Sequence, residues 1–276
     1  DVYKRQEHNI PKVGDIVMAY LDDPIWYVND QPYPLFYGIV FTATYKEDAV
    51  DYVAYDQLRY LKSKDTLVYS GYTTDFIKTC AEYAGLRTGF FYHGAHYIKN
   101  RIEENTSYFD MIGNALDQEL LHKGNLCVLY DDFGKVTLDN IENMKLDTLL
   151  DEESMAEKEE TSTIDDRYTS VKLIEENKET GMRKVYERKN NTLFNLYGKL
   201  QYFGDVQQGE DGWEKANVLL KLYSQPSRTF TIQKAAGDPR VRAGRSIIIN
   251  YVTDTGGMYR YSYCLLYTSP SPRDCS

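Results

Sequence analysis

The residues that most often carry enzyme chemistry are few in this chain and stand apart from one another. Two histidines occur in the short motif His93-Gly94-Ala95-His96. A metal site needs at least three converging ligands, and neither a Glu-x-x-His motif nor a cysteine pair accompanies this motif. The spacing therefore predicts loop histidines and no metal site.

Two cysteines, Cys80 and Cys127, lie in the apolar stretches IKTCAEYAG and NLCVLYD. A catalytic cysteine needs a thiolate beside a histidine in a partly exposed, electropositive setting. Cys80 falls on the apolar stripe of a predicted helix and Cys127 within a predicted strand. Both are predicted to be buried, reduced thiols, as is usual for proteins that assemble in a cytoplasm.

Adjacent carboxylates occur at Glu103-Glu104 and Asp131-Asp132. Two carboxyl groups that flank a glycosidic bond are enough for its hydrolysis. Neighbouring acids are, however, expected by chance in a chain with 42 Asp and Glu residues against 32 Lys and Arg. Asp131-Asp132 also opens a predicted turn, where aspartate is favoured for its side-chain hydrogen bonds. We do not predict a catalytic pair.

The glycines of GDVQQGEDGW, which are Gly204, Gly209 and Gly212, resemble a phosphate-binding loop only superficially. The stretch lacks the lysine of such loops, and its acids would repel phosphate. A Gly-x-Ser-x-Gly elbow does not occur either. The sequence therefore predicts no catalytic, cofactor-binding or metal-binding residues, and a protein that is not an enzyme.

The composition limits the partners of the chain. Its net charge of −10 argues against binding nucleic acid through phosphate neutralisation. No apolar run approaches the roughly 20 residues that a membrane-spanning helix needs. Tyrosine is abundant, with 26 residues against 10 Phe and 2 Trp. Tyrosine suits strands with one packed face and one wet face, so the composition favours β structure.

The hydrophobic pattern predicts a strand-rich α+β protein. Three strands are expected within 13–23, 35–46 and 49–65, the last running into a short helical turn. Two amphipathic helices should follow, the first capped by Thr74 and Gly85 and the second ending at Gly124. The predicted buried faces of these helices consist of Phe76, Ile77, Cys80, Tyr83 and Ala84, and of Tyr108, Met111, Ile112, Ala115, Leu116 and Leu120.

The helices are predicted to be followed by a hairpin, NLCVLYDDFGKVTLDN, which belongs to the same central α+β unit. Residues 147–166 carry nine acids and one lysine, which is typical of a solvated connector. A hairpin with its turn at 177–181, the helix DGWEKANVLLKLYSQ and further strands should follow. The expected domains are 7–65 (β barrel), 66–146 (α+β), the connector 147–166, and 167–263 (second barrel with one helix).

The barrel prediction rests on an internal repeat. Residues 12–20, KVGDIVMAY, resemble residues 242–251, RAGRSIIINY: a basic and a small residue, a glycine, a polar residue and then an apolar strand. Many β barrels begin a strand with such a turn. Because strand-rich segments flank both copies, we predict two small β barrels, one at each end of the chain, around a central α+β unit.

The two ends, DVYKRQ and CLLYTSPSPRDCS, differ from the protein between them. Residues 1–6 read as a translation of GAT GTG TAT AAG AGA CAG, a transposase adapter used in sequencing. The reverse complement, TGT CTC TTA TAC ACA TCT, gives residues 264–269, and the adapter continuation gives 270–274. We therefore expect 1–6 and 264–276 to be non-native and to pack against nothing, and the native sequence to be cut at both ends.

The order of several segments resembles the phage tail proteins of the XkdQ/YqbQ type. The resemblance covers nearly all of 13–260, and its strongest parts are AYDQLRYL (54–61) and the strand start at Ala243-Gly244. It implies a structural baseplate hub related to contractile-tail hub proteins, in which three subunits form a ring of six barrels that adapts the tail tube to the spike.

The same resemblance implies the partners and location of the protein. It implies a homotrimer in the virion tail, assembled in the bacterial host cytoplasm, with contacts to tail tube, spike and baseplate proteins and none to membrane. The acidic surface fits a channel that DNA crosses without specific binding. The alternative is a tail-associated cell-wall (peptidoglycan) hydrolase, because tail proteins often carry lytic modules.

Overall fold

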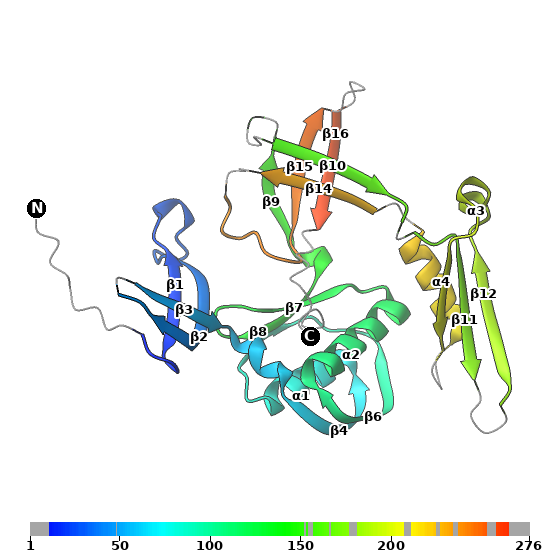
Figure 1. Cartoon of the computed structure of the whole chain (residues 1–276), viewed down its shortest axis with the longest axis horizontal. Coiled ribbons are helices and arrows are strands. Elements are labelled where there is room, and N and C mark those ends of the chain that lie inside the picture. The colour runs from blue at the N-terminus through cyan, green and yellow to red at the C-terminus, as the bar shows by residue number, and fades with distance from the viewer. Residues whose placement is uncertain are drawn as a thin grey trace, which may run out of the picture.

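The computed structural model shows a mixed α+β chain that is rich in strands and has few helices (Figure 1). It describes residues 11–47, 49–151, 153, 157–165, 167–176, 181–206, 211–224, 227–233, 237–252 and 258–264. Of the residues predicted to be non-native, 1–6 and 265–276 lie outside these ranges. Cys264, the first of the predicted C-terminal group, is described and pairs with Ser246 as the last residue of a strand, against the expectation that it packs against nothing. Among the described helices, none combines the length and apolar character needed to cross a membrane.

The first three strands form an open antiparallel sheet, as the alternating pattern predicted. It consists of β1 (Ile16–Leu21), β2 (Tyr33–Tyr45) and β3 (Val50–Tyr55), with β2 in the centre. Gly38 lies inside β2, where a glycine often marks a bulge or a barrel corner. The bulge lies farther on, between Val40 and Thr42. Gly38 is instead required by close packing, since a Cβ there would lie 2.4 Å from the Phe36 ring.

The central unit (residues 64–140) packs two helices against two sheets. Its helices are α1 (Thr73–Tyr83) and α2 (Tyr108–Lys123), which contact each other. One sheet pairs β4 (Lys64–Tyr72) with β6 (Tyr97–Ser107); the other has the order β5-β8-β7, from Thr88–Phe91, Val136–Asn140 and Cys127–Asp131. Side chains from both helices, including Phe76, Ile77, Met111 and Ala115, form a fully buried core with strand β8.

Both central helices lie where their 3.6-residue period predicted. Ser107 caps α2 by accepting from the Asp110 amide, and Gly124 ends the helix in the left-handed conformation. Two details of α1 differ from the prediction. Thr74 is not its N-cap, because the helix begins one residue earlier and the Thr74 hydroxyl bonds a neighbouring loop. Tyr83 is 64% exposed, since it is the last residue of the helix.

The second unit (residues 167–224) is a smaller α+β structure at one end of the molecule (Figure 1). Its sheet has the order β12-β11-β13, from Arg183–Lys189, Ser170–Glu176 and Gln201–Asp205. The predicted hairpin β11–β12 is confirmed, although residues 177–180 of its turn lie outside the described ranges. Helices α3 (Asn191–Tyr197) and α4 (Gly212–Tyr223) complete the unit, and α4 packs on β11 and β12.

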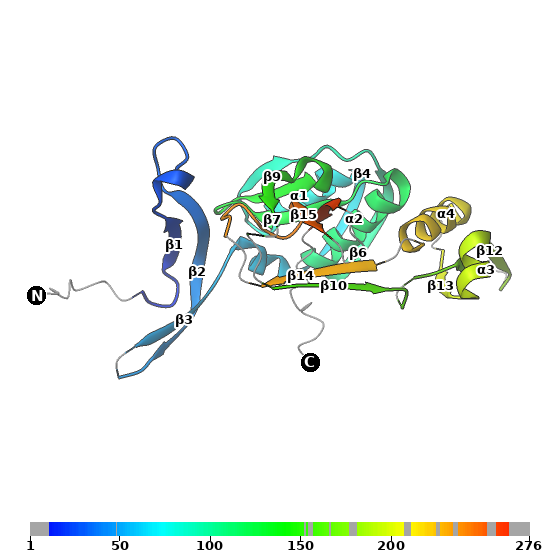
Figure 2. The same ribbon diagram turned by 90° about the horizontal axis from the view of Figure 1, so that it is seen from above.

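The remaining strands form a sheet and a ribbon. In the sheet, β15 (Ser246–Val252) pairs antiparallel with β16 (Met258–Cys264) and parallel with β9 (Lys145–Leu150). In the ribbon, β10 (Glu157–Thr163) pairs with β14 (Ser227–Gln233), so the second unit is inserted between the two ribbon strands. The sheet and the ribbon occupy different layers when the molecule is seen from above (Figure 2).

These strands correct one prediction and leave another unconfirmed. The acidic segment 147–166 is not only an irregular connector, because it contains the end of β9 and all of β10; partner strands override the low strand propensity of its acids. No sheet of the described residues closes into a barrel. The two-barrel arrangement is therefore not confirmed, since the strands expected to form the second barrel are distributed over three sheets.

The internal repeat does extend to local structure. In both copies the amide of the fourth residue donates to the carbonyl of the first and so closes a turn. The hydrogen bonds are Asp15 N to Lys12 O and Arg245 N to Arg242 O, each at 3.0 Å. The glycine in each turn has a positive φ, +94° at Gly14 and +85° at Gly244. A strand, β1 or β15, begins two residues after each glycine. The repeat is thus a repeated turn that starts a strand.

Candidate functional site

The N-terminal sheet meets the central unit at the tip of the β7–β8 hairpin. Phe133 and Gly134 both have positive φ, which fits a tight two-residue hairpin turn. The Phe133 ring packs against two tyrosine rings of the sheet, at 5.2 Å from Tyr20 and 5.7 Å from Tyr37. A Cβ at Gly134 would lie 2.8 Å from the Tyr37 ring. The aromatic tip therefore fixes the hairpin on the sheet.

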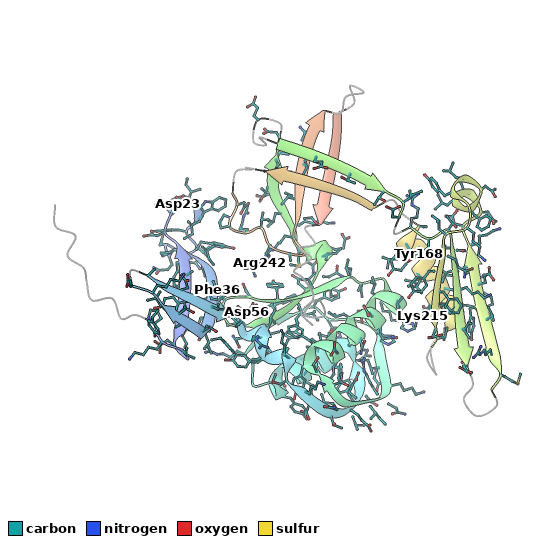
Figure 3. The ribbon with its side chains drawn as sticks, viewed as in Figure 1. Asp23, Phe36, Asp56, Tyr168, Lys215 and Arg242 are labelled. Atoms are coloured by element: carbon teal, nitrogen blue, oxygen red, sulfur yellow. The ribbon has the colours of Figure 1, made fainter. Side chains whose placement is uncertain are left out.

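The loop before β15 joins the same hairpin through Arg242. Its guanidinium donates to the carbonyl of Asp131 at 3.0 Å and lies 5.1 Å from the Tyr130 ring centre. Figure 3 shows Arg242 above this hairpin and Asp56 beside it. Two segments far apart in the sequence, the N-terminal sheet with the adjoining Asp56 and the loop that contains Arg242, thus converge on β7–β8.

Asp131 has a structural role at this junction. One carboxylate oxygen accepts from the Gly134 amide at 2.8 Å and so closes the hairpin turn. Burial, and then the nearby charges of Asp56 and Asp132, raise the pKa of Asp131 to about 6. A raised pKa is typical of catalytic acids. Here one carboxylate oxygen closes the turn and Arg242 bonds the backbone carbonyl, while the other carboxylate oxygen, Oδ2, is buried with no hydrogen-bond partner among the described residues.

A second contact region surrounds the loop that contains His93 and His96. Glu119 of α2 is 1% exposed and accepts hydrogen bonds from the amides of Ala95 (3.0 Å) and His96 (2.9 Å). Asn125 donates to the same carboxylate at 2.6 Å. Burial opposes ionisation of Glu119, but these hydrogen bonds outweigh it and hold the pKa of Glu119 below its usual value. The carboxylate thus anchors the loop to α2.

The two loop histidines turn to different neighbours. The His93 ring lies 6.0 Å from the Tyr72 ring, whereas the His96 ring stacks on His122 of α2 at 4.4 Å. No group of three or more His, Cys, Asp or Glu residues in the described part of the chain could hold a metal ion. The motif therefore does not bring its two imidazoles together.

The family of the chain follows from comparison with known proteins. The sequence model of the YQBQ-like family matches residues 3–264. The chain belongs to the YQBQ-like family. Two relatives from Bacillus subtilis (strain 168), phage-like element PBSX protein XkdQ and protein YqbQ, are each 29% identical to it, over 227 and 228 residues; each alignment covers 78% of this chain and 68% of the relative.

Solved structures share the fold of this YQBQ-like chain at low sequence identity. The prophage MuSo2 43 kDa tail protein from Shewanella oneidensis gives a TM-score of 0.56 at 10% identity, covering 90% of this chain and 82% of its own. The tail protein from Neisseria meningitidis MC58 gives a TM-score of 0.54 at 13% identity, covering 84% of this chain and 81% of its own. Prophage tail protein gp18 from Listeria monocytogenes EGD-e gives a TM-score of 0.52 at 12% identity, covering 86% of this chain and 72% of its own. The fold is therefore that of prophage tail proteins.

The remaining candidate residues of the YQBQ-like chain are the two cysteines and the adjacent acids Glu103 and Glu104. Cys80 and Cys127 are free and buried, as predicted, and burial raises the pKa of each thiol to about 12. Such thiols stay protonated and are poor nucleophiles. On β6, Glu103 forms an ion pair with Arg101, while Glu104 is exposed.

The glycine-rich stretch of the YQBQ-like chain forms no phosphate cradle in its described residues. Gly204 lies in β13 and Gly212 begins α4, while Gly209 lies outside the described ranges. Asp211 caps α4 by accepting from the amides of Trp213 (2.9 Å) and Glu214 (3.1 Å). The capping carboxylate therefore occupies the helix N-terminus where a phosphate would bind.

Proposed function

We propose that this chain is a structural subunit of a phage or phage-derived tail, and that it forms the baseplate hub as a homotrimeric ring between tail tube and spike. Membership in the YQBQ-like family and the shared fold of prophage tail proteins support the tail role. In this role the protein is not an enzyme, and DNA crosses the ring without specific binding because both are negatively charged.

The observation that carries the trimer is the exposed edge strand β1. Its six residues, IVMAYL, contain neither a charge nor a proline, and it lies at the edge of its sheet. Ile16, Met18 and Tyr20, which alternate along β1, are 54%, 51% and 49% exposed. Monomeric proteins usually protect such edges with charges, prolines or covering segments. An uncharged, apolar edge is therefore best explained by a neighbouring subunit that covers it.

The open sheets also fit a ring in which barrels are completed by assembly. The N-terminal sheet and the β16-β15-β9 sheet each have three strands and two edges. The repeated glycine turn begins a strand in each of them. A ring of three subunits would place six such sheets around the channel and pair or cover their edges.

The first prediction concerns this edge. The purified chain should have three times the chain mass of 32.0 kDa in light scattering after size-exclusion chromatography. Met18→Glu should give a monomer, because it places a charge in the covered edge. Val68→Glu is the matched control: Val68 is 76% exposed on β4, outside the proposed interface, and its change should leave the trimer intact. A monomeric wild type, or a trimer that survives Met18→Glu, would contradict the hub.

The second prediction separates the hub from the cell-wall hydrolase. The purified chain should produce no clearing zone in a zymogram of Gram-positive cell walls, because Glu103, Asp131 and Cys127 are all held in structural contacts or buried. A clearing zone that disappears in Glu103→Gln or Asp131→Asn would identify the chain as a hydrolase. A zone that persists in both variants would point to a contaminating enzyme, and repurification should remove it.

A further inference from the structure

Helices α2 and α4 join the central unit to the second unit. The two helices contact each other (Figure 1). Leu121 of α2 packs on the core of the second unit. His122, the residue after Leu121, makes a polar contact between the two helices. Its Nδ1 lies 3.4 Å from a carboxylate oxygen of Glu214 on α4, and its Nε2 lies 3.0 Å from the Oε1 of Gln118. The His122 imidazole thus contacts Glu214 of the second unit as well as Gln118 of its own helix.

The connecting imidazole is stacked on a second one. The rings of His96 and His122 are nearly parallel, with 7° between their planes and 4.4 Å between their centres. We call this pair the imidazole stack. The charged groups that face it are Glu119 and Lys123 from α2 and Glu214 from α4, whereas His93 of the same loop turns to Tyr72.

We propose that the imidazole stack is a pH-sensitive latch: the α2–α4 contact between the two units is held while at least one ring is neutral, and it loosens when both rings are protonated. One proton is well accommodated. Both nitrogens of His122 face oxygen atoms, so a doubly protonated His122 can donate to Glu214 and Gln118 together.

A second proton, on His96, has no such acceptor among the described residues. A charge on His96 would lie a ring-stacking distance from a charge on His122. The nearest carboxylate, Glu119, already accepts from two backbone amides and Asn125. The ring nitrogens of His96 find no hydrogen-bond partner in the described residues. Two cations that face each other repel, and the repulsion acts on the helix that carries His122 and on its contact with α4.

The direction of the pH dependence follows from His96. Burial and then the neighbouring His122 lower the pKa of His96 below its ordinary 6.5. The folded chain therefore binds fewer protons at this residue than the unfolded chain does. The contribution of His96 to the stability of the contact is fully present above about pH 6.5, and it is lost as the pH falls through the lowered pKa. The latch lies within one chain and operates whether or not the chain assembles.

Amide hydrogen exchange of the whole chain tests the latch. After correction for the intrinsic pH dependence of exchange, peptides from α4 should exchange about fivefold or more faster at pH 5.0 than at pH 7.5. Peptides from α1, which is in the core away from α4, should not change. In His96→Phe, which keeps a stacking ring but cannot be protonated, α4 should exchange at nearly the same corrected rate at both pH values.

Two further measurements keep the result unambiguous. In Glu214→Gln, the acceptor for His122 is weakened, so α4 should be less protected already at pH 7.5. Circular dichroism and the α1 peptides show whether each variant is folded. Equal protection of wild-type α4 at both pH values would overturn the latch without any variant. The same would follow if a folded His96→Phe, or a folded His96→Gln in its place, kept the wild-type pH response.

Discussion

Replacing Glu119 with alanine should lower the free energy of unfolding by about 3 kcal/mol, because it leaves buried hydrogen-bond donors without an acceptor. The carboxylate holds the amides of Ala95 and His96, and it is 1% exposed. Water cannot replace it without opening the packing around α2. Urea unfolding followed by circular dichroism measures the loss, and the loop that contains His93 should become accessible to proteases.

The control for this variant is Glu82→Ala on α1. Glu82 is an exposed helical glutamate, and its ion pair with Lys78 has a distance of 4.0 Å. Exposed pairs of this kind contribute about 0 to 1 kcal/mol. The loss of unfolding free energy for Glu119→Gln should lie between those for Glu119→Ala and Glu82→Ala, since glutamine keeps one oxygen acceptor and the volume of the side chain. Equal stability of Glu119→Ala and Glu82→Ala would show that the loop does not depend on the carboxylate.

The second large effect should come from Gly244→Ala, compared with the same change at its repeat partner Gly14. Both glycines have positive φ, so alanine costs about 1–2 kcal/mol at either position. A Cβ at Gly14 meets no atom within 4 Å, whereas at Gly244 it would lie 2.7 Å from the Val128 side chain. Overpacking adds about 1–3 kcal/mol, so Gly244→Ala should destabilise the chain more than Gly14→Ala does.

The double variant Gly244→Ala with Val128→Ala separates the two causes. Removing the Val128 methyl groups makes room for the new Cβ. Val128→Ala should therefore lower the free energy of unfolding less in the Gly244→Ala background than in the wild type. Trp26 and Trp213 allow unfolding to be followed by fluorescence near the N-terminal sheet and in the second unit. Equal losses of unfolding free energy for Gly14→Ala and Gly244→Ala would mean that a Cβ in the turn before β15 makes no steric clash with Val128 of β7.

The sequence predicted local elements well because their signals are local. The 3.6-residue period located α1 and α2, and the Asp131–Lys135 turn located the β7–β8 hairpin. Sheet order could not be predicted in the same way. Strands β9 and β10 lie in an acidic stretch whose composition resembles a linker, and they are strands because β15 and β14 pair with them. Such long-range pairing leaves little trace in the composition of either partner.

The candidate contacts were missed for a related reason. His122 and Glu214 are far apart in the sequence, and each is unremarkable on the polar side of its helix. Glu119 did carry a signal, because it follows Met111 and Ala115 at helical spacing on the apolar face of α2. An acid at such a position predicts a buried carboxylate with partners. Reading that position as an exception to the apolar stripe would have pointed to the His96 loop.

The parallel pairing of β9 with β15 has a consequence for the order in which the chain folds as it leaves the ribosome. Leu150 of β9 cannot pair until Ile249 has been synthesised, and Glu157 of β10 cannot pair until Gln233 has been synthesised. The whole second unit is synthesised in the interval. That unit has its own core and can fold during the delay. Meanwhile β10, with the sequence EKEETST, waits as an unpaired strand. Its charges discourage pairing with other nascent chains, so the acidity of this segment protects a strand whose partner is made late.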